Sequence, residues 1–259
     1  MTALEAIAAE LRQAERTGRP IGPIRERIAL DADAYGIQKI NTRHRLAQGG
    51  RIVGRKIGLT NPAVQAQLGV DQPDYGTLFA DMDIDHDGVI PWIAGAQMKV
   101  EAEIAFILGR DLPQADIGMG EVIAAIDCAV AALEIVGSRI ADWNIRFRDT
   151  VADNGSSAFF TLSPAPRLLR EIDLLDCGME LFRGEERVSQ GRGRACLSSP
   201  LNAVRWLART MAADGTPLRA GDVVLSGALG PMVAAAPGAV FRAHIEGFGE
   251  TAIRFGEAA

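Results

Sequence analysis

Residues 99–108 constrain the fold most, because polar and apolar side chains alternate through this segment with a period of two. Successive side chains of a β-strand point to opposite faces of the sheet. One face of the predicted strand carries Val100, Ala102, Ile104, Phe106 and Leu108. The other carries Glu101 and Glu103 beside Ala105 and Ile107. Two acids on an otherwise apolar face are costly to bury unless they are protonated, paired with a base or bound to a cation.

A third acid, Glu134, lies in the apolar run 131–136. Three converging carboxylates favour a bound cation, and the absence of an accompanying Cys or His favours Mg²⁺ or Mn²⁺ over zinc. The pattern also allows a simpler alternative. In it, Glu101 and Glu103 lie on an exposed edge strand, and Glu134 pairs with an arginine such as Arg139.

The order of elements is helical first and then mostly β. Apolar periodicity predicts one helix over residues 2–17 and a second that begins at Asp31 or Asp33 as its cap and ends near residue 48. Further helices are expected at 62–68, 120–133 and 200–213, with a turn at 71–76. Strands are expected at 97–108, 133–136, 179–182, 222–226, 231–235, 239–245 and 251–255. We therefore expect a single α+β domain over 1–259, with a helical segment in residues 1–50.

Composition excludes several classes of protein. With 48% hydrophobic residues, the 259-residue chain has enough apolar side chains for a sizeable core. A net charge of −6 disfavours nucleic acid as a partner. No stretch has the composition of a signal peptide or a membrane span. Three widely spaced cysteines fit buried thiols in a reducing compartment, so we expect a cytoplasmic protein.

Six ordered segments carry a resemblance to a known family. They are VGRKIGLT (53–60), QPDYGTLFADM (72–82), VEAE (100–103), EIVGSRIADW (134–143), DTVADNGSS (149–157) and LSGALGPMV (225–233). With the helical start and IEGFG at 245–249, they cover nearly the whole chain. The chain resembles the 2-oxopent-4-enoate (2-keto-4-pentenoate) hydratase family of the fumarylacetoacetase-like superfamily.

The resemblance implies a fumarylacetoacetase-type mixed β-sandwich roll preceded by helices, with Glu101, Glu103 and Glu134 as ligands of Mg²⁺ or Mn²⁺. It also implies the addition of water to a 2-hydroxydienoate, giving a 4-hydroxy-2-oxo acid in the meta-cleavage degradation of aromatic compounds. A metal suits that chemistry, because chelation orients the acid and stabilises the charge that develops at its C2 oxygen.

The resemblance also supplies candidates for proton transfer and substrate binding. Lys56 matches the expected acid/base, and a desolvated lysine titrates in a useful range. Asp74 would accept a proton, orient Lys56 or position water, although an acid in a turn is commonly structural. Ser156, preferred over Ser157, would donate a hydrogen bond to the substrate carboxylate. The neighbouring Arg55 is expected to face solvent.

Several polar residues near these motifs are expected to have supporting roles. Arg139 and Asp142 would pair beside the metal. Asp149 and Asp153 would brace the loop before Ser156. His44, His86 and His244 are scattered along the sequence and are not expected to be catalytic. No dinucleotide fingerprint, phosphate-binding loop or nucleophile elbow occurs, so we expect no organic cofactor.

Three alternatives remain open. The first is the related 4-oxalocrotonate (2-oxo-3-hexenedioate) decarboxylase, against which the segment 225–232 favours the hydratase. The second is hydrolysis of an acylpyruvate, which the absence of a histidine near 97–99 disfavours. The third is a non-catalytic partner subunit, which retention of the three acids and Lys56 disfavours. The resemblance further implies a homo-oligomer built on pentamers, and it leaves open an association with another pathway enzyme.

Overall fold

A computed structural model describes residues 2–61, 65 and 72–258 of the chain. The helix expected at 62–68 lies outside these residues except at Gln65, and so does the first residue of the turn expected at 71–76. Among the described residues, none of the helices combines the length and apolar character needed to cross a bilayer.

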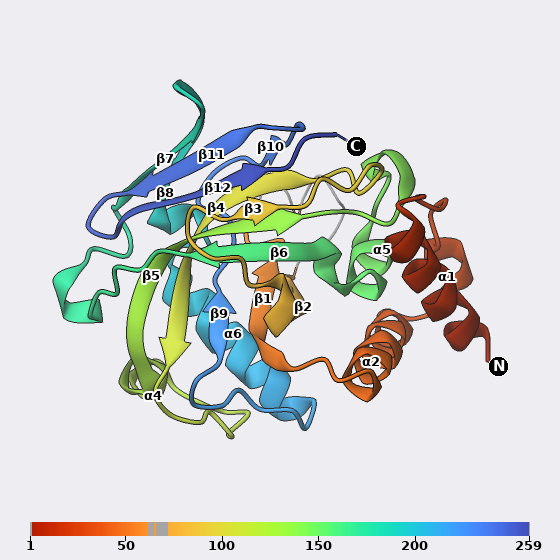
Figure 1. Ribbon diagram of the computed structural model, residues 1–259. Helices are drawn as coiled ribbons and strands as arrows, with labels where there is room; N and C mark the ends of the chain where they lie inside the picture. The colour runs from red at the N-terminus through yellow and green to blue at the C-terminus, as the bar shows by residue number, and fades with distance from the viewer. Residues whose placement is uncertain (1, 62–64, 66–71, 259) are drawn as a thin grey trace.

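Two helices open the chain, as the periodicity predicts. They are α1 (Ala3–Thr17) and α2 (Asp31–Ala47), joined through the 3-10 helix η1 (Arg25–Arg27). Thr2 and Glu5 form a capping box at the start of α1. Asp33 accepts from the Leu30 amide at 3.1 Å, so this acid acts from inside the first turn of α2 rather than as its N-cap. Figure 1 shows both helices beside α5 (Phe147–Ala152), with which they share an apolar cluster.

The larger sheet has seven strands in the order β2-β1-β9-β4-β5-β6, with β10 also paired to β4. Its strands are β1 (Ile52–Gly58), β2 (Asp74–Phe79), β4 (Lys99–Leu108), β5 (Ile126–Val136), β6 (Ser157–Leu162), β9 (Val223–Leu225) and β10 (Val233–Ala234). β9 is parallel to β1 and antiparallel to β4. This short strand from late in the chain therefore joins the first strand to the acidic one.

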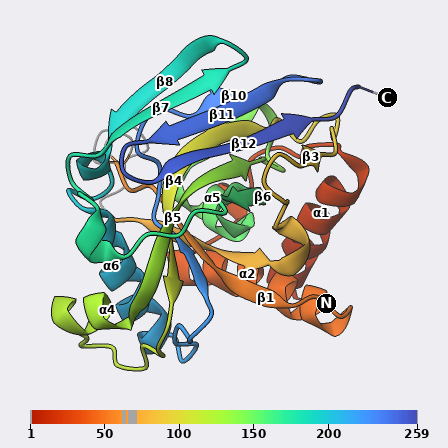
Figure 2. The ribbon, with the colours of Figure 1, turned by 60° about the vertical axis from the view of Figure 1, so that its left-hand side comes forward.

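The smaller sheet has five strands in the order β3-β12-β11-β7-β8. They are β3 (Val89–Ile90), β7 (Gly178–Arg183), β8 (Glu186–Arg192), β11 (Val240–Ile245) and β12 (Gly249–Phe255). Figures 1 and 2 show β7, β8, β11 and β12 side by side across the larger sheet. Within the part of the chain that the structure describes in full, the remaining helices are α4 (Met119–Ala125), α6 (Pro200–Ala213) and the 3-10 turns η2 (Ala80–Met82), η3 (Ala141–Trp143), η4 (Asn154–Ser156), η5 (Leu169–Glu171) and η6 (Gly193–Ala195).

Both faces of β4 are buried, but against different neighbours. Val100, Ala102 and Ile104 belong to the main core, which also contains residues of the smaller sheet and of α6. Ala105 lies on the opposite face, in a second cluster with Leu225 and other apolar side chains of the larger sheet. This arrangement confirms the expected mixed roll of two packed sheets preceded by helices.

Two predicted elements are wrong. The helix expected over 120–133 ends at Ala125, and residues 126–136 form β5. Alanine favours a helix locally, but here β4 and β6 hydrogen-bond to both edges of the segment, and tertiary packing decides its conformation. The turn expected at 71–76 gives way to a strand from Asp74 onward, because residues 74–79 pair with β1. The helix at 200–213 and the expected late strands are present.

Candidate metal and acid–base site

The register of β4 against β5 brings the three predicted ligands together. Glu101 lies directly opposite Glu134 in the antiparallel pair, so the two side chains share a face. Glu103 lies two residues further along β4 and therefore points the same way. One carboxylate oxygen from each of the three lies within 4.8 Å of the others. The expected convergence of Glu134 on the pair is thus present in the geometry.

The three carboxylates are short of hydrogen-bond donors. Glu103 and Glu134 are almost fully buried, and Glu101 is half-buried. Glu103 Oε2 accepts from the Gly227 amide at 2.9 Å. Within the described part of the chain, Glu103 Oε1 and Glu134 Oε2 have no hydrogen-bond partner. Buried carboxylate oxygens without donors fit a hard divalent cation such as Mg²⁺ or Mn²⁺.

Electrostatics within this glutamate trio (Glu101, Glu103 and Glu134) also favour a bound cation. Burial first, and then the Glu134 charge, raise the pKa of Glu101 to about 7. The same two causes raise the pKa of Glu103 well above its ordinary value. In the metal-free fold Glu101 and Glu103 therefore hold protons more readily than ordinary glutamates, and a divalent ion would displace them.

Lys56 reaches the trio from β1. Its Nζ lies 3.0 Å from Glu134 Oε1, and only 3% of its side chain is exposed. Burial on its own would lower the Lys56 pKa, but the charges of Glu134, Asp74 and Glu101 outweigh it and raise the pKa above its ordinary value. The carboxylates around Lys56 thus favour its ammonium form. The alternative pairing of Glu134 with Arg139 is wrong.

Asp74 begins β2, directly opposite Gly58 of β1. It is 1% exposed, and its Oδ1 has no hydrogen-bond partner among the described residues. Burial raises the pKa of this carboxyl, and the Lys56 ammonium opposes that shift. Asp74 is therefore a strand residue of the site, next to Lys56 in electrostatic terms, rather than a surface turn acid.

All these side chains lie at one end of the roll. Lys56 is near the end of β1, Asp74 starts β2, Glu101 is in the first half of β4 and Glu134 is in the last third of β5. The same face beyond them is filled by apolar residues, among them Leu225. On this face, the polar groups therefore have an apolar cluster on one side of them.

Ser156 lies in the turn η4, just before β6. Its hydroxyl lies 3.4 Å from Thr150 Oγ1, and the residue is 2% exposed. The hydroxyl of the other candidate, Ser157, donates to Asn154 O at 2.9 Å. Of the two serines, Ser156 therefore has the hydroxyl without a strong local acceptor, which is consistent with its predicted role.

The same turn also fixes Lys56. Gly155 has φ +61°, and a Cβ at this position would lie 2.7 Å from Lys56 Cε. Asn154 holds the turn against β2, because its amide group accepts from the Thr77 amide at 2.7 Å and donates to Thr77 O at 2.9 Å. The backbone of this turn thus forms a wall beside the Lys56 side chain. Glycine is the residue that fits at position 155 without a shift of the turn or of the lysine.

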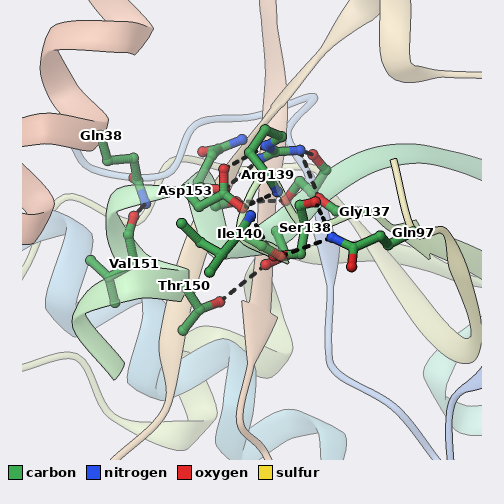
Figure 3. A network of polar contacts seen from close by, with 12 residues as sticks. Gln38, Gln97, Gly137, Ser138, Arg139, Ile140, Thr150, Val151 and Asp153 are labelled. Atoms are coloured by element: carbon green, nitrogen blue, oxygen red, sulfur yellow. Dashed lines mark hydrogen bonds and ion pairs between the residues drawn. The ribbon is translucent and has the colours of Figure 1, made fainter. Parts of the chain in front are cut away.

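Arg139 joins the two ends of the loop between β5 and β6 (Figure 3). Its guanidinium forms a buried ion pair with Asp153 and donates to the carbonyls of Gly137 and Ser157 at 2.8 and 3.0 Å. The expected Arg139–Asp142 pair is wrong, because the described contact of Asp142 is its amide, which donates to Gln97 Oε1 at 2.7 Å. Asp153 does brace the loop as expected.

Other sequence-based expectations have mixed outcomes. Asp149 braces the region by accepting from the amides of Ile24 and Arg25. Arg55 is half-buried rather than solvent-facing. Cys128 is partly exposed, so the expectation of three buried thiols is wrong at that position. The three histidines lie outside the strands of the site, in α2, between η2 and β3, and in β11.

Three residues at or beside the site were not predicted from the sequence: Gly227, Asn154 and Lys99. The Gly227 amide and the Asn154 side chain both lie within segments that carry the family resemblance, but a backbone donor and a loop amide leave no pattern. Lys99, on the same strand face as the acids, had one signal: the chain contains only three lysines against 24 arginines.

The family described as "Fumarylacetoacetate (FAA) hydrolase C-terminal" matches residues 51–255. The chain belongs to the fumarylacetoacetate hydrolase family. The match spans every strand of both sheets, whereas α1 and α2 precede it.

Relatives within the fumarylacetoacetate hydrolase family cover nearly the whole chain. It is 55% identical to "2-keto-4-pentenoate hydratase 2" of Dechloromonas aromatica (strain RCB), over 97% of each chain. It is also 55% identical to "2-keto-4-pentenoate hydratase" of Paraburkholderia xenovorans (strain LB400), over 97% of this chain and 94% of that one. The structure of "4-oxalocrotonate decarboxylase from Pseudomonas putida G7", complexed with magnesium and adipate, matches with a TM-score of 0.90 and 32% identity over 97% of each chain. The expected family is confirmed.

Proposed function

We propose that this chain is a divalent-metal-dependent hydratase that adds water to 2-hydroxypenta-2,4-dienoate, or a close 2-hydroxydienoate, to give a 4-hydroxy-2-oxo acid. The observation that carries the proposal is the convergence of three buried carboxylates beside a buried lysine. The relatives named as 2-keto-4-pentenoate hydratases, at 55% identity over almost their whole length, support the choice of reaction.

Glu101, Glu103 and Glu134 would hold Mg²⁺ or Mn²⁺. When bound, that ion would orient the 2-oxo acid end of the substrate and supply positive charge that stabilises the negative charge developing on the C2 oxygen. The magnesium in the similar decarboxylase structure supports this assignment. Gly227 would keep Glu103 in place, because its amide already donates to Glu103 Oε2, whereas Oε1 has no hydrogen-bond partner in the described part of the chain.

Lys56 and Asp74 would move the protons. The reaction removes the proton of the C2 hydroxyl and adds one at C5, after which water supplies OH to C4 and H to C3. Lys56 carries a proton and can donate it, whereas Asp74 has a free Oδ1 and a raised pKa and can accept one. Ser156 would donate to the substrate carboxylate, and Gly155 would keep the lysine from swinging away.

A second reaction remains a candidate because of one observation. The chain superposes on a 4-oxalocrotonate decarboxylase with a TM-score of 0.90, so the same roll accommodates loss of CO₂ from a 2-oxo dicarboxylic acid. The higher identity to the hydratases favours hydration. A hydratase consumes the monocarboxylic diene without gas release, whereas a decarboxylase acts on the dicarboxylic acid.

One assay separates these outcomes. Purified protein with Mg²⁺ would be given 2-hydroxypenta-2,4-dienoate or 2-oxo-3-hexenedioate, with loss of diene absorbance and release of CO₂ followed together. We expect diene loss without CO₂, abolished by EDTA and by Glu103→Gln. Diene loss that persists in both cases would refute the metal-dependent hydratase, and CO₂ release from the dicarboxylic acid would favour the decarboxylase.

We also propose the setting in which the enzyme works. The substrate class fits the meta-cleavage degradation of aromatic compounds, and the chain would act in the cytoplasm as a homo-oligomer built on pentamers, in association with a neighbouring pathway enzyme. The family resemblance supports these assignments. Light scattering coupled to gel filtration gives the subunit number directly.

A further inference from the structure

Lys99 occupies the rim of the acidic face. On β4 the side chains of residues 99, 101 and 103 point the same way. Glu103 is fully buried, whereas Glu101 and Lys99 are half-buried, so exposure increases toward the start of the strand. Lys99 is therefore the next side chain that a molecule above the trio would meet on its way out.

An aromatic ring holds this lysine in place. Lys99 Nζ lies 4.1 Å from the centre of the Trp143 ring, within the range of a cation–π contact. The indole is fixed in turn, because Trp143 Nε1 donates to Gln97 O at 2.8 Å. Such a contact leaves the N–H groups of the ammonium available to an anion on the side away from the ring.

Gln97 anchors the loop that carries the indole (Figure 3). Its side chain donates to Ser138 O and Ile140 O at 3.0 and 2.8 Å and accepts from the Asp142 amide. Gln97, Asp142 and Trp143 all have φ between 52° and 59°, a region that non-glycine residues adopt at a cost. Strain gathered beside a polar cluster is typical of a built functional site.

The net negative charge of the site favours a second cation beside a bound substrate. Four carboxylates and Lys56 sum to −3 (−4 + 1), and a divalent ion brings the total to −1. A 2-oxo acid adds a further negative charge. Among the described residues of β1, β2, β4, β5 and β9, Lys56 and Lys99 are the cations on this face, and Lys56 is already paired with Glu134.

Strand register also places Lys99 level with the predicted carboxylate donor. Val136 of β5 lies opposite Lys99 on one side and opposite Ser157, the residue after Ser156, on the other. Lys99 and Ser156 thus flank the same end of the site, beyond the Glu101–Glu134 pair. Lys56 approaches from β1, on the far side of β9 from β4.

We propose that Lys99, presented on the Trp143 ring, binds the C1 carboxylate of the 2-oxo acid, leaving Lys56 to act on the carbon chain. This assignment rests on the proposed function, because it takes the substrate to be a 2-oxo or 2-hydroxydienoic acid bound at the trio. Lys99 is a substrate-binding residue that sets the preference for a carboxylate at C1.

Ligand binding tests the assignment without turnover. In the presence of Mg²⁺, calorimetry would measure the affinity of Lys99→Met for 2-oxopentanoate and for its uncharged ethyl ester. We expect the acid to bind roughly tenfold or more weakly than it does to the wild type, the range for a lost charge-assisted hydrogen bond, with ester affinity unchanged. Lys39→Met, a partly exposed lysine paired with Asp214, is the matched control and should bind the acid normally.

Other results would overturn it. Unchanged affinity for the acid removes Lys99 from the site, and equal loss of acid and ester makes its role structural. A loss confined to 2-oxohexanedioate would mean that Lys99 binds a distal carboxylate instead. Tryptophan fluorescence adds an independent readout, because 2-oxopentanoate should alter the emission of the wild type but not of Trp143→Phe. A response that persists in that variant contradicts the ring contact.

Turnover distinguishes this assignment from the proposed function. With 2-hydroxypenta-2,4-dienoate, Lys99→Met should raise KM roughly tenfold and leave kcat nearly unchanged. If the wild type turns over the diene and the variant shows the same KM, the assignment fails and the hydratase stands. If the wild type binds 2-oxopentanoate through Lys99 but leaves the diene intact, the hydratase fails and the carboxylate site stands.

Discussion

Lys56 Nζ lies 3.0 Å from Glu134 Oε1, and both groups are almost completely buried. Glu134 is therefore both the ion-pair partner of Lys56 and a predicted ligand of the metal. A cation at the trio would compete with Lys56 for Glu134 and so free the ammonium to move. This competition would make metal binding and the proposed proton transfer by Lys56 dependent on one another.

Replacing Lys56 should separate binding from chemistry. Lys56→Met keeps most of the side-chain volume but removes the proton, so we expect kcat to fall by roughly 10²- to 10⁴-fold. Mg²⁺ affinity should hold or rise, because no ammonium then competes for Glu134. Lys56→Arg restores the charge but holds its proton too tightly to transfer it, and it should remain inactive. Stopped-flow loss of diene absorbance measures both variants, and an active arginine variant would contradict the role.

Removing one metal ligand should weaken metal binding but stabilise the metal-free fold. Glu103→Gln should weaken Mn²⁺ binding by more than the roughly 10- to 100-fold typical of losing an outer partner of a metal ligand. The metal-free variant should nevertheless resist urea better than the metal-free wild type at neutral pH, because burying Glu103 with its raised pKa requires a proton that glutamine does not need. Glu185→Gln, in the exposed turn between β7 and β8, is the control and should change neither quantity.

Metal binding should depend on pH with a defined sign. The pKa of Glu101 is about 7 in the metal-free fold against an ordinary 4.5, so the folded chain binds more protons than the unfolded chain across that window. The free energy of unfolding without metal should thus fall as pH rises from about 4.5 to about 7. Mg²⁺ displaces protons, so its affinity should rise with pH through the same range. Calorimetry in two buffers of different ionisation enthalpy measures the release, and a pH-independent affinity would contradict it.

The wall against Lys56 should not tolerate a methyl group. In Gly155→Ala the new Cβ meets Lys56 Cε, and φ is +61°, so the lysine or the turn must shift. We expect kcat to fall at least tenfold, with Mg²⁺ affinity largely retained. Gly120→Ala is the matched control, because the residue is in α4 and, apart from its chain neighbours and the backbone of that helix, no described atom lies within 4 Å of its Cβ. That substitution should leave kcat unchanged, and equal rates for both variants would argue against the wall.

The buried ion pair of the loop should matter more than a surface pair. Arg139→Met leaves Asp153 buried without its partner, which typically costs about 3–5 kcal/mol of unfolding free energy. Arg183→Met breaks an exposed pair with Glu186 and should cost about 0–1 kcal/mol. Urea denaturation compares them. Adding Asp153→Leu to Arg139→Met should recover part of the lost unfolding free energy, because the unpaired buried carboxylate is then removed. A double variant no more stable than Arg139→Met would show that the loss does not come from that carboxylate.

The alternating pattern of the sequence was enough to predict which side chains share a face of β4, but not to predict how the site is assembled. Alternation places Glu101 and Glu103 together, because a strand's side-chain direction is a local property. The approach of Glu134 depends on the register between β4 and β5, which is set by hydrogen bonds across the sheet and leaves no mark in either segment. The resemblance to a family supplied that link.

The wrong predictions share a cause. Residues 126–133 are rich in alanine and Asp74 lies among turn-forming residues, so local preference favoured a helix and a turn. Both segments are strands because neighbours on the sheet satisfy their backbone groups. Arg139 was likewise assigned to Asp142 or Glu134, but the loop brings it to Asp153. Partners across a fold are decided by tertiary geometry.

The position of β9 has a consequence for biosynthesis. Every predicted ligand and proton-transfer residue lies before residue 157, yet β1 and β4 become neighbours only through residues 223–225. A ribosome-bound chain that has exposed its first two hundred residues thus displays all the acids and Lys56 without the strand that joins them. On this basis we expect the lysine–glutamate contact of the nascent protein to form only when translation is nearly complete, after most of the surrounding enzyme has been made.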